Sequence, residues 1–147
     1  MKLKKCTIIL NSFVLLSFIF SPFVLAAENW QKINDNFYID VNSIEKQGGD
    51  YITGYFKQIK SKEIIKGKQV SYTKIWTGAY CDIALQDDVR KLEYPIYWFY
   101  DKNNKLLAED NLHKYWKKHY PKGHLGIMHP EDDDYGELYF NTLCKFK

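Results

Sequence analysis

The sequence lacks the short motifs that mark the common classes of enzyme. It has no glycine-rich phosphate loop, no Gly-x-Ser-x-Gly elbow, no His-Glu-x-x-His pair and no calcium-loop spacing. Isolated acidic residues such as Asp40, Asp82 and Glu109 usually lie at the surface when they are close to strands. We therefore expect no catalytic residue and no enzymatic activity.

The sequence also lacks an apolar run long enough to span a membrane, which takes roughly 20 residues. The longest run, from Ile8 to Phe20, is interrupted by Asn11, Ser12 and Ser17. Lysines precede it and Val24-Leu25-Ala26 follows it, a pattern typical of a cleavable signal peptide. We predict a signal peptide over residues 1–26 and, because no repeat or linker divides the remainder, one domain over residues 27–147.

No cysteine lies directly after the apolar run, where a bacterial lipoprotein carries its lipidated residue. We therefore expect an exported protein, either periplasmic or secreted to the cell surface or medium. It would not be lipidated and would keep no stable membrane anchor after cleavage.

Cysteine is scarce, with three residues in the chain, of which Cys6 lies in the predicted signal peptide. Cys81 and Cys144 remain, and two cysteines in an exported domain are expected to pair. The bridge would close a loop of roughly 60 residues and contribute about 4 kcal/mol to stability. A Cys/His metal site or a catalytic thiol has no support, because there is no Cys-x-x-Cys and no histidine near Cys81.

No excess of charge of either sign remains once the predicted signal peptide is removed. Taking its three lysines from 21 basic residues leaves 18 basic against 18 acidic residues. Nucleic-acid-binding domains are usually net basic, so we expect no nucleic-acid partner. The charge is unevenly placed, and each charged stretch is either a solvated face or a binding surface. The basic stretch holds Lys57, Lys60, Lys62, Lys66, Lys68 and Lys74, and the acidic one holds Glu131, Asp132, Asp133, Asp134 and Glu137.

Short stretches rich in β-branched and aromatic residues predict strands joined by turns. Pro95 predicts an edge or a bulge, because proline has no amide donor for the sheet. Alternation in the strand 70–83 places one set of side chains on a common face: Thr73, Ile75, Thr77, Ala79, Cys81 and Ile83. The expected elements are strands over 30–33, 37–40, 51–59, 70–83, 90–101 and 105–111, a helical turn over 41–46, a break at 47–50 and a hairpin tip over 61–69.

The C-terminal part predicts an irregular connection over residues 112–130, with a short helix near 112–118, and then a terminal helix. The acidic stretch after Pro130 is expected to open that helix, since negative charge is favoured at a helix N-terminus. One helix face would carry Tyr135, Leu138, Tyr139 and Thr142. The predicted class is α+β, a single antiparallel β-sheet with a C-terminal α-helix tied to it by the disulfide.

Two features suggest binding. The histidines His113, His119, His124 and His129 lie close together beside Met128, and they are either exposed residues or weak candidates for binding a metal or haem. The predicted domain also has more aromatic residues than a small core can bury, so some of Tyr97, Trp98, Phe99, Tyr115, Trp116 and Tyr120 would form a protein-contact patch or the margin of the core.

The order of several motifs resembles the surface-adhesin protein E family. The matching positions are Trp30, Ile33, Phe37-Tyr38-Ile39-Asp40, Ser43-Ile44, Cys81, Trp116, Glu137-Leu138-Tyr139 and Cys144. The resemblance implies a small extracytoplasmic domain, an antiparallel sheet with a helix, a disulfide between Cys81 and Cys144, and a tendency to form a homodimer. Founding members are lipoproteins that bind host matrix proteins such as vitronectin and laminin, and haem binding is associated with them. This sequence departs from them in lacking a lipidated cysteine.

These observations together predict a non-enzymatic exported binding protein, with a host matrix or envelope protein as its partner. The candidate contact residues are Lys57, Lys60, Lys62, Lys66, Lys68, Lys74, Trp98 and Trp116. Two alternatives stay open. One is a periplasmic inhibitor of a cell-wall hydrolase, similar to lysozyme inhibitors, whose acidic segment Glu131 to Asp134 caps a basic enzyme. The other is capture of haem or a metal by the histidines.

Overall fold

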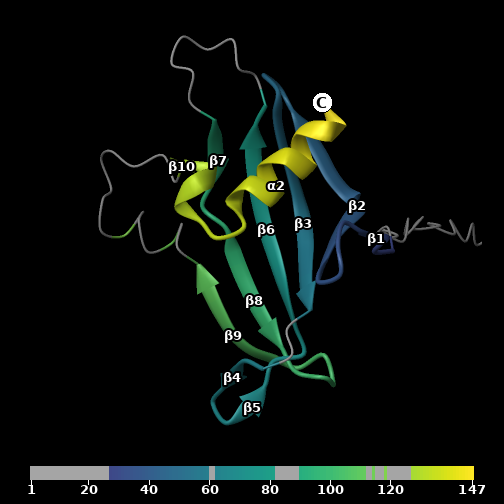
Figure 1. Cartoon of the computed structure of the whole chain (residues 1–147), viewed down its shortest axis with the longest axis vertical. Coiled ribbons are helices and arrows are strands. Elements are labelled where there is room, and N and C mark those ends of the chain that lie inside the picture. The colour runs from purple at the N-terminus through teal and green to yellow at the C-terminus, as the bar shows by residue number, and fades with distance from the viewer. Residues whose placement is uncertain (1–26, 60–61, 82–89, 112–113, 115–117, 119–126) are drawn as a thin grey trace, which may run out of the picture.

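An antiparallel sheet with one α-helix across it makes up most of the computed structural model (Figure 1). The structure describes residues 27–59, 62–81, 90–111, 114, 118 and 127–147. In this part of the chain the main sheet consists of β1 (Trp30–Lys32), β2 (Phe37–Gln47), β3 (Tyr51–Ile59), β6 (Tyr72–Tyr80), β7 (Lys91–Glu93), β8 (Ile96–Tyr100), β9 (Leu106–Asn111) and β10 (Ile127–Met128). The α+β class is confirmed.

The first hairpin follows the predicted pattern up to Asp40 and then departs from it. Residues 41–46 were expected to form a helical turn, but β2 continues through them to Gln47, and the prediction is wrong. The extra residues are taken up by a register shift against β3 between Asp40 and Glu45. Ser43 stabilises this bulge, since its hydroxyl donates to the Asp40 carbonyl at 2.6 Å and accepts from the Tyr55 N–H at 2.9 Å.

β3 and β6 are paired in continuous register and form the centre of the sheet. Thr73, Ile75, Thr77 and Ala79 are fully buried, so the predicted alternation along β6 is confirmed. The predicted hairpin tip is a separate two-stranded hairpin, β4 (Ile64–Ile65) and β5 (Lys68–Gln69). Lys66 and Gly67 both have positive φ angles in its turn, a conformation that favours glycine.

The stretch 90–101 forms two strands instead of one, because the chain breaks at Tyr94 and Pro95. Both β7 and β8 pair with β6, and Pro95 is buried between them without an amide to donate. β9 follows after a turn in which Asp101 Oδ1 accepts from the N–H groups of Asn103 and Lys105. β10, which pairs with β7, was not expected, because two residues are too short to show alternation.

The C-terminal segment packs one helix onto the sheet. The acidic stretch was expected to open this helix, but it forms a 3-10 turn, η1 (Pro130–Asp132), and a bend, and α2 (Gly136–Leu143) begins after it. The predicted helix face is wrong in including Tyr135, because Tyr135 precedes the helix and is exposed. The residues of α2 that are buried are Gly136, Tyr139, Phe140, Thr142 and Leu143.

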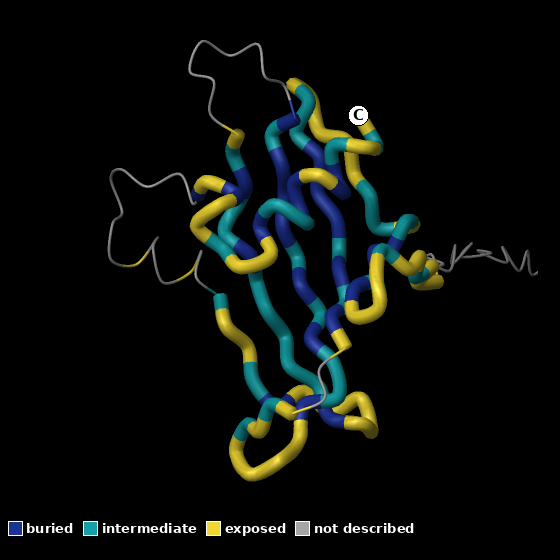
Figure 2. The backbone as a smooth tube through the Cα atoms, in the orientation of Figure 1, coloured by how far each residue is buried: buried dark blue, intermediate teal, exposed yellow. Residues whose placement is uncertain are grey.

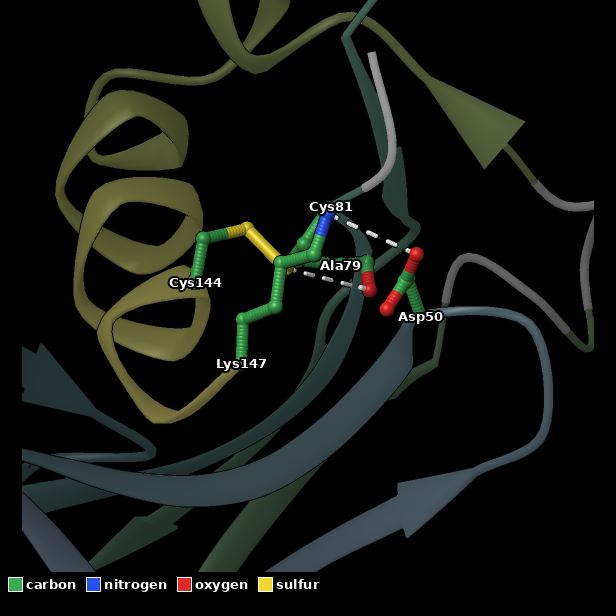
Figure 3. Close-up of a disulfide and its surroundings, with 5 residues drawn as sticks. All are labelled: Asp50, Ala79, Cys81, Cys144 and Lys147. Atoms are coloured by element: carbon green, nitrogen blue, oxygen red, sulfur yellow. Dashed lines mark hydrogen bonds and ion pairs between the residues drawn. A yellow bond between two sulfur atoms is a disulfide. The ribbon is translucent and has the colours of Figure 1, made fainter. Parts of the chain in front are cut away.

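The core lies between α2 and the central strands, where Figure 2 shows the buried backbone. Tyr139 is fully buried, with its ring 4.8 Å from that of Phe56. The predicted disulfide is present: Cys81, just after β6, is bonded to Cys144, just after α2, with a Cα–Cα distance of 5.4 Å (Figure 3). Beside it, Cys81 donates its N–H to the Asp50 carbonyl at 2.9 Å.

A short second 3-10 turn, η2 (Cys144–Phe146), ends the chain, and Lys147 forms an ion pair with Asp50 at 3.4 Å. Among the residues described, no helix has the length and apolar character needed to cross a membrane.

Candidate binding surface on the open face of the sheet

The two faces of the sheet have different surroundings. α2 lies against one of them, since the Tyr139 ring packs against that of Phe56 and a Cβ at Gly54 would lie 3.1 Å from Leu143. The alternate residues of the same strands point away from the helix. We call the opposite surface the open face and define it by Trp30, Tyr38, Tyr55, Lys57, Tyr72, Lys74, Trp76, Trp98 and Tyr100, all of which are half-buried.

Strand register sets these side chains in three parallel rows across the sheet. The first row runs Lys32, Tyr38, Lys57, Lys74, Trp98, Glu109, from β1 to β9. The second runs Trp30, Asp40, Tyr55, Trp76, Ile96, Asn111 over the same strands. The third is shorter and runs Ile59, Tyr72, Tyr100, Leu106. Neighbours in a row are direct cross-strand partners, so the aromatic rings and lysines lie side by side on this face.

Lys57 lies at the centre of this surface and is surrounded by aromatic rings. Its Nζ is 4.2 Å from the ring centroid of Trp30, 5.8 Å from that of Tyr38 and 6.0 Å from that of Tyr72. Burial lowers the pKa of Lys57, although the negative charges of Glu28 and Asp40 act in the opposite direction. Within the described part of the chain, Lys57 forms no ion pair. It is a cation held on aromatic faces without a carboxylate in contact.

Lys74 is the cross-strand partner of Lys57, and its positive charge is balanced by an ion pair with Glu28. Its Nζ lies 4.6 Å from the ring centroid of Tyr55 and 2.7 Å from Oε1 of Glu28. The other oxygen of Glu28 accepts from the indole N–H of Trp30 at 2.9 Å. The hydrogen bond from Lys74 is the main cause of the lowered pKa of Glu28. Glu28 therefore fixes Trp30 and Lys74 relative to each other and leaves Lys57 free to meet another anion.

The structure divides the predicted contact residues between two places. Lys57, Lys74 and Trp98 come together on the open face, with the Trp98 ring 6.2 Å from that of Tyr55. Lys62, Lys66 and Lys68 instead lie exposed at the β4–β5 hairpin. Two further candidates, Lys60 and Trp116, lie outside the described residues.

The predicted aromatic patch is also divided. Trp98 lies on the open face, whereas Tyr97 points to the helix side and donates from its hydroxyl to Asp133 at 2.8 Å. Phe99 shares that side with Tyr97, because the two alternate with Trp98 along β8. Tyr115 and Tyr120 lie outside the described residues.

The histidine cluster cannot be placed as a unit, since His113, His119 and His124 lie outside the described residues. His129 is exposed, and its backbone N–H donates to Asp132 at 3.1 Å. The residues described contain no group of three or more His, Cys, Asp or Glu side chains arranged to hold a metal.

Most aromatic residues of the open face were not singled out from the sequence. Trp30, Tyr38, Tyr55, Tyr72 and Trp76 belong to it as much as Trp98 does. A signal was present, because Tyr55 and Lys57 alternate in one strand and Tyr72, Lys74 and Trp76 alternate in the next. The pairing of these strands then places both patterns on one face.

Together, the fold and this surface define a small α+β domain whose sheet presents an aromatic and cationic face, a composition suited to non-covalent recognition. No protein-family model matches the chain, and no curated protein or solved structure matches it either. The resemblance to the surface-adhesin protein E family therefore stays a prediction.

Proposed function

We propose that this chain is an exported, non-enzymatic binding protein that contacts another protein through the open face. The observation that carries the proposal is the arrangement of Lys57 and Lys74 among seven aromatic side chains on a sheet face opposite α2. The disulfide supports export, since such bonds persist in oxidising compartments.

The open face has the composition of a binding hot spot, the part of an interface that contributes most of the binding energy. Tryptophan and tyrosine are enriched among the residues that dominate binding energy, because their rigid rings contribute a large area at a small entropic cost. Lys57 adds specificity: it is already partly desolvated, and a partner carboxylate would supply the counter-ion that no described residue provides. We infer that the partner presents an acidic group beside an apolar surface.

The partner is a host matrix protein or a protein of the bacterial envelope. The first follows from the resemblance to adhesins, and vitronectin and laminin are therefore the first proteins to test. Homodimerisation, which the same resemblance implies, would compete for the open face if it used that face. Fractionation of producing cells separates the two classes, since confinement to the periplasm would exclude a host partner.

The decisive experiment measures binding to immobilised vitronectin, laminin and isolated envelope proteins with matched variants. Trp98→Ala and Lys57→Glu should each lower the affinity at least about tenfold, as expected for hot-spot residues. Lys46→Glu is the control, because Lys46 is exposed but does not lie on the open face. Its cross-strand partner, Ile52, is buried on the face that α2 covers. If the control variant weakens binding as much as the other two, or if neither of these two weakens it, the open face is not the binding surface.

A second candidate function rests on the acidic segment before α2. Glu131, Asp132 and Asp134 are exposed there, which suits a contact with a basic enzyme such as lysozyme. Inhibition of lysozyme by the purified protein, abolished by Asp132→Lys with Asp134→Lys and retained in Trp98→Ala, would favour this function over the first. Haem capture is tested separately by a Soret shift on adding hemin.

A further inference from the structure

One end of the molecule combines exposed lysines with exposed aliphatic side chains. It is built from the β4–β5 hairpin and the turn between β8 and β9, which lie together at the bottom of Figure 1. We call it the basic end and define it by Lys62, Lys66, Lys68, Lys102 and Lys105, all exposed. Both segments are drawn mostly in the colour of exposed residues in Figure 2.

Little negative charge opposes these lysines within the described residues. Glu63 is half-buried, and Asp101 is 9% exposed with its Oδ1 accepting two backbone N–H groups. Those hydrogen bonds, led by the one from Lys105, hold the pKa of Asp101 below its usual value, so it remains a carboxylate committed to the turn. The basic end is therefore net positive, although the predicted mature chain is neutral.

The same end carries the exposed aliphatic residues. Ile64 on the hairpin is 70% exposed, Ile59 at the end of β3 is 43% exposed, and Leu106 at the start of β9 is 47% exposed. Ile59 and Leu106 flank the stacked rings of Tyr72 and Tyr100, whose centroids are 4.9 Å apart. Exposed aliphatic side chains gathered at one end of the molecule and surrounded by lysines have the character of a contact surface.

A cavity of about 620 Å³ lies at the base of the hairpin. Lys68, Lys102, Ser71 and Asn103 contribute donors to its lining, and Ile59 contributes apolar surface. Asp101 lines it too, with its carboxylate engaged as described. The cavity thus offers both charge and apolar contact to an amphiphilic anion.

We propose that the basic end docks reversibly on an anionic phospholipid surface. Ile64 enters the boundary between headgroups and acyl chains, while the lysines around it contact lipid phosphates. Anionic lipids attract lysine clusters, and an inserted aliphatic side chain adds apolar burial. An acidic protein would also satisfy the lysines, but it would need a matching pocket for Ile64, whereas the boundary between headgroups and acyl chains accepts an aliphatic side chain without one. The basic end adjoins the open face along the row from Ile59 to Leu106, but Ile64 and the five lysines are not among the residues that define the open face.

The test is co-sedimentation of the purified protein with vesicles of a two-to-one mixture of phosphatidylcholine and phosphatidylglycerol, and with pure phosphatidylcholine vesicles. Binding is expected to the first and not to the second, and added salt should weaken it because the lysines are exposed. Lys62→Glu with Lys68→Glu should lower the partition coefficient by roughly 25-fold or more, since each lysine contributes about fivefold near an anionic surface. Ile64→Ser should lower it roughly tenfold, whereas Ile64→Leu should retain it.

Lys46→Glu with Lys145→Glu is the matched control, because both lysines are exposed. They belong to the last residues of β2 and to η2, which lie at the other end of the sheet from the basic end in Figure 1. This variant should sediment with the anionic vesicles as the unmodified protein does. Failure to bind the anionic vesicles, or equal loss in the control, overturns the proposal. The proposal is also overturned if the basic end binds an acidic protein but no vesicle, since the partner would then be a protein. Unfolding curves of all variants show whether a loss of binding is a loss of fold.

Discussion

The hydroxyl of Tyr97 donates a 2.8 Å hydrogen bond to Oδ2 of Asp133 and thereby ties β8 to the segment that leads into α2. Burial raises the pKa of Tyr97 above its usual value, and the negative charge of Asp133 raises it further. The neutral phenol is thus the form that the folded chain stabilises. The acidic segment is therefore partly held by the core, which explains why Asp133 is half-buried while its neighbours are exposed.

This relationship predicts a loss of stability at alkaline pH. In the unfolded chain Tyr97 ionises near its usual pKa of about 10, whereas in the folded chain it keeps its proton at higher pH. Above about pH 10 the unfolded state binds fewer protons, so the free energy of unfolding falls as the pH rises. Below about pH 10 Tyr97 is protonated in both states and does not make the free energy of unfolding depend on pH. Denaturant unfolding on both sides of about pH 10 should show a smaller alkaline loss in Tyr97→Phe. An equal loss in the two proteins would show that Tyr97 does not titrate differently in the folded state.

Tyr139 offers a contrast with Tyr97. Its hydroxyl is buried close to that of Tyr97 and, among the described residues, forms no hydrogen bond of good geometry. Tyr139→Phe removes an unpaired polar atom and keeps the ring contact with Phe56, so stability at neutral pH should be unchanged or higher by up to about 1 kcal/mol. Tyr97→Phe should instead cost about 1–3 kcal/mol, because Asp133 loses its donor. Thermal or denaturant unfolding compares the two variants directly. A loss of stability in Tyr139→Phe as large as in Tyr97→Phe would show that the Tyr139 hydroxyl does form a stabilising hydrogen bond.

The start of α2 depends on a glycine that no other residue can replace without movement. A Cβ at Gly136 would lie 2.1 Å from the carbonyl oxygen of Pro130. Gly136→Ala should therefore shift the backbone of η1 and destabilise the protein by about 1–3 kcal/mol. Gly48→Ala is the control, because a Cβ there meets nothing within 4 Å, and it should change stability by less than about 0.5 kcal/mol. Unfolding curves that do not distinguish the two variants would show that Pro130 can move away freely.

The features that could be predicted from the sequence are those that depend on local pattern. The strand 51–59 has the expected bounds, and the buried alternation of β6 leads directly to Cys81 and its bond with Cys144. The bulge in β2 could not be predicted in this way. Its local sequence favours a turn, and pairing with β3 overrides that preference.

The open face needs information that local pattern does not contain. Lys57 and Trp98 lie in one row only because β3, β6 and β8 pair in one particular register. The contact between Trp30 and Lys57 likewise joins two residues from strands that are not neighbours in the sheet. The lysine-rich and aromatic-rich stretches therefore predicted the right residue types for a binding surface. They grouped together residues that the fold places on different surfaces.

The last prediction concerns the disulfide and tests how strongly α2 depends on it. The bond joins residues 63 positions apart, so its removal should lower the free energy of unfolding by about 4 kcal/mol through the entropy of the unfolded chain. Cys81→Ala with Cys144→Ala should show this loss in denaturant unfolding. The unmodified protein should lose a similar amount under reducing conditions, whereas the variant should be insensitive to reductant. Because Leu143 and Phe140 still bury apolar surface against the sheet, the variant should keep α2 docked if enough stability remains. A loss below about 1 kcal/mol would mean that packing alone already restrains the chain, and the disulfide would then have little effect on the fold.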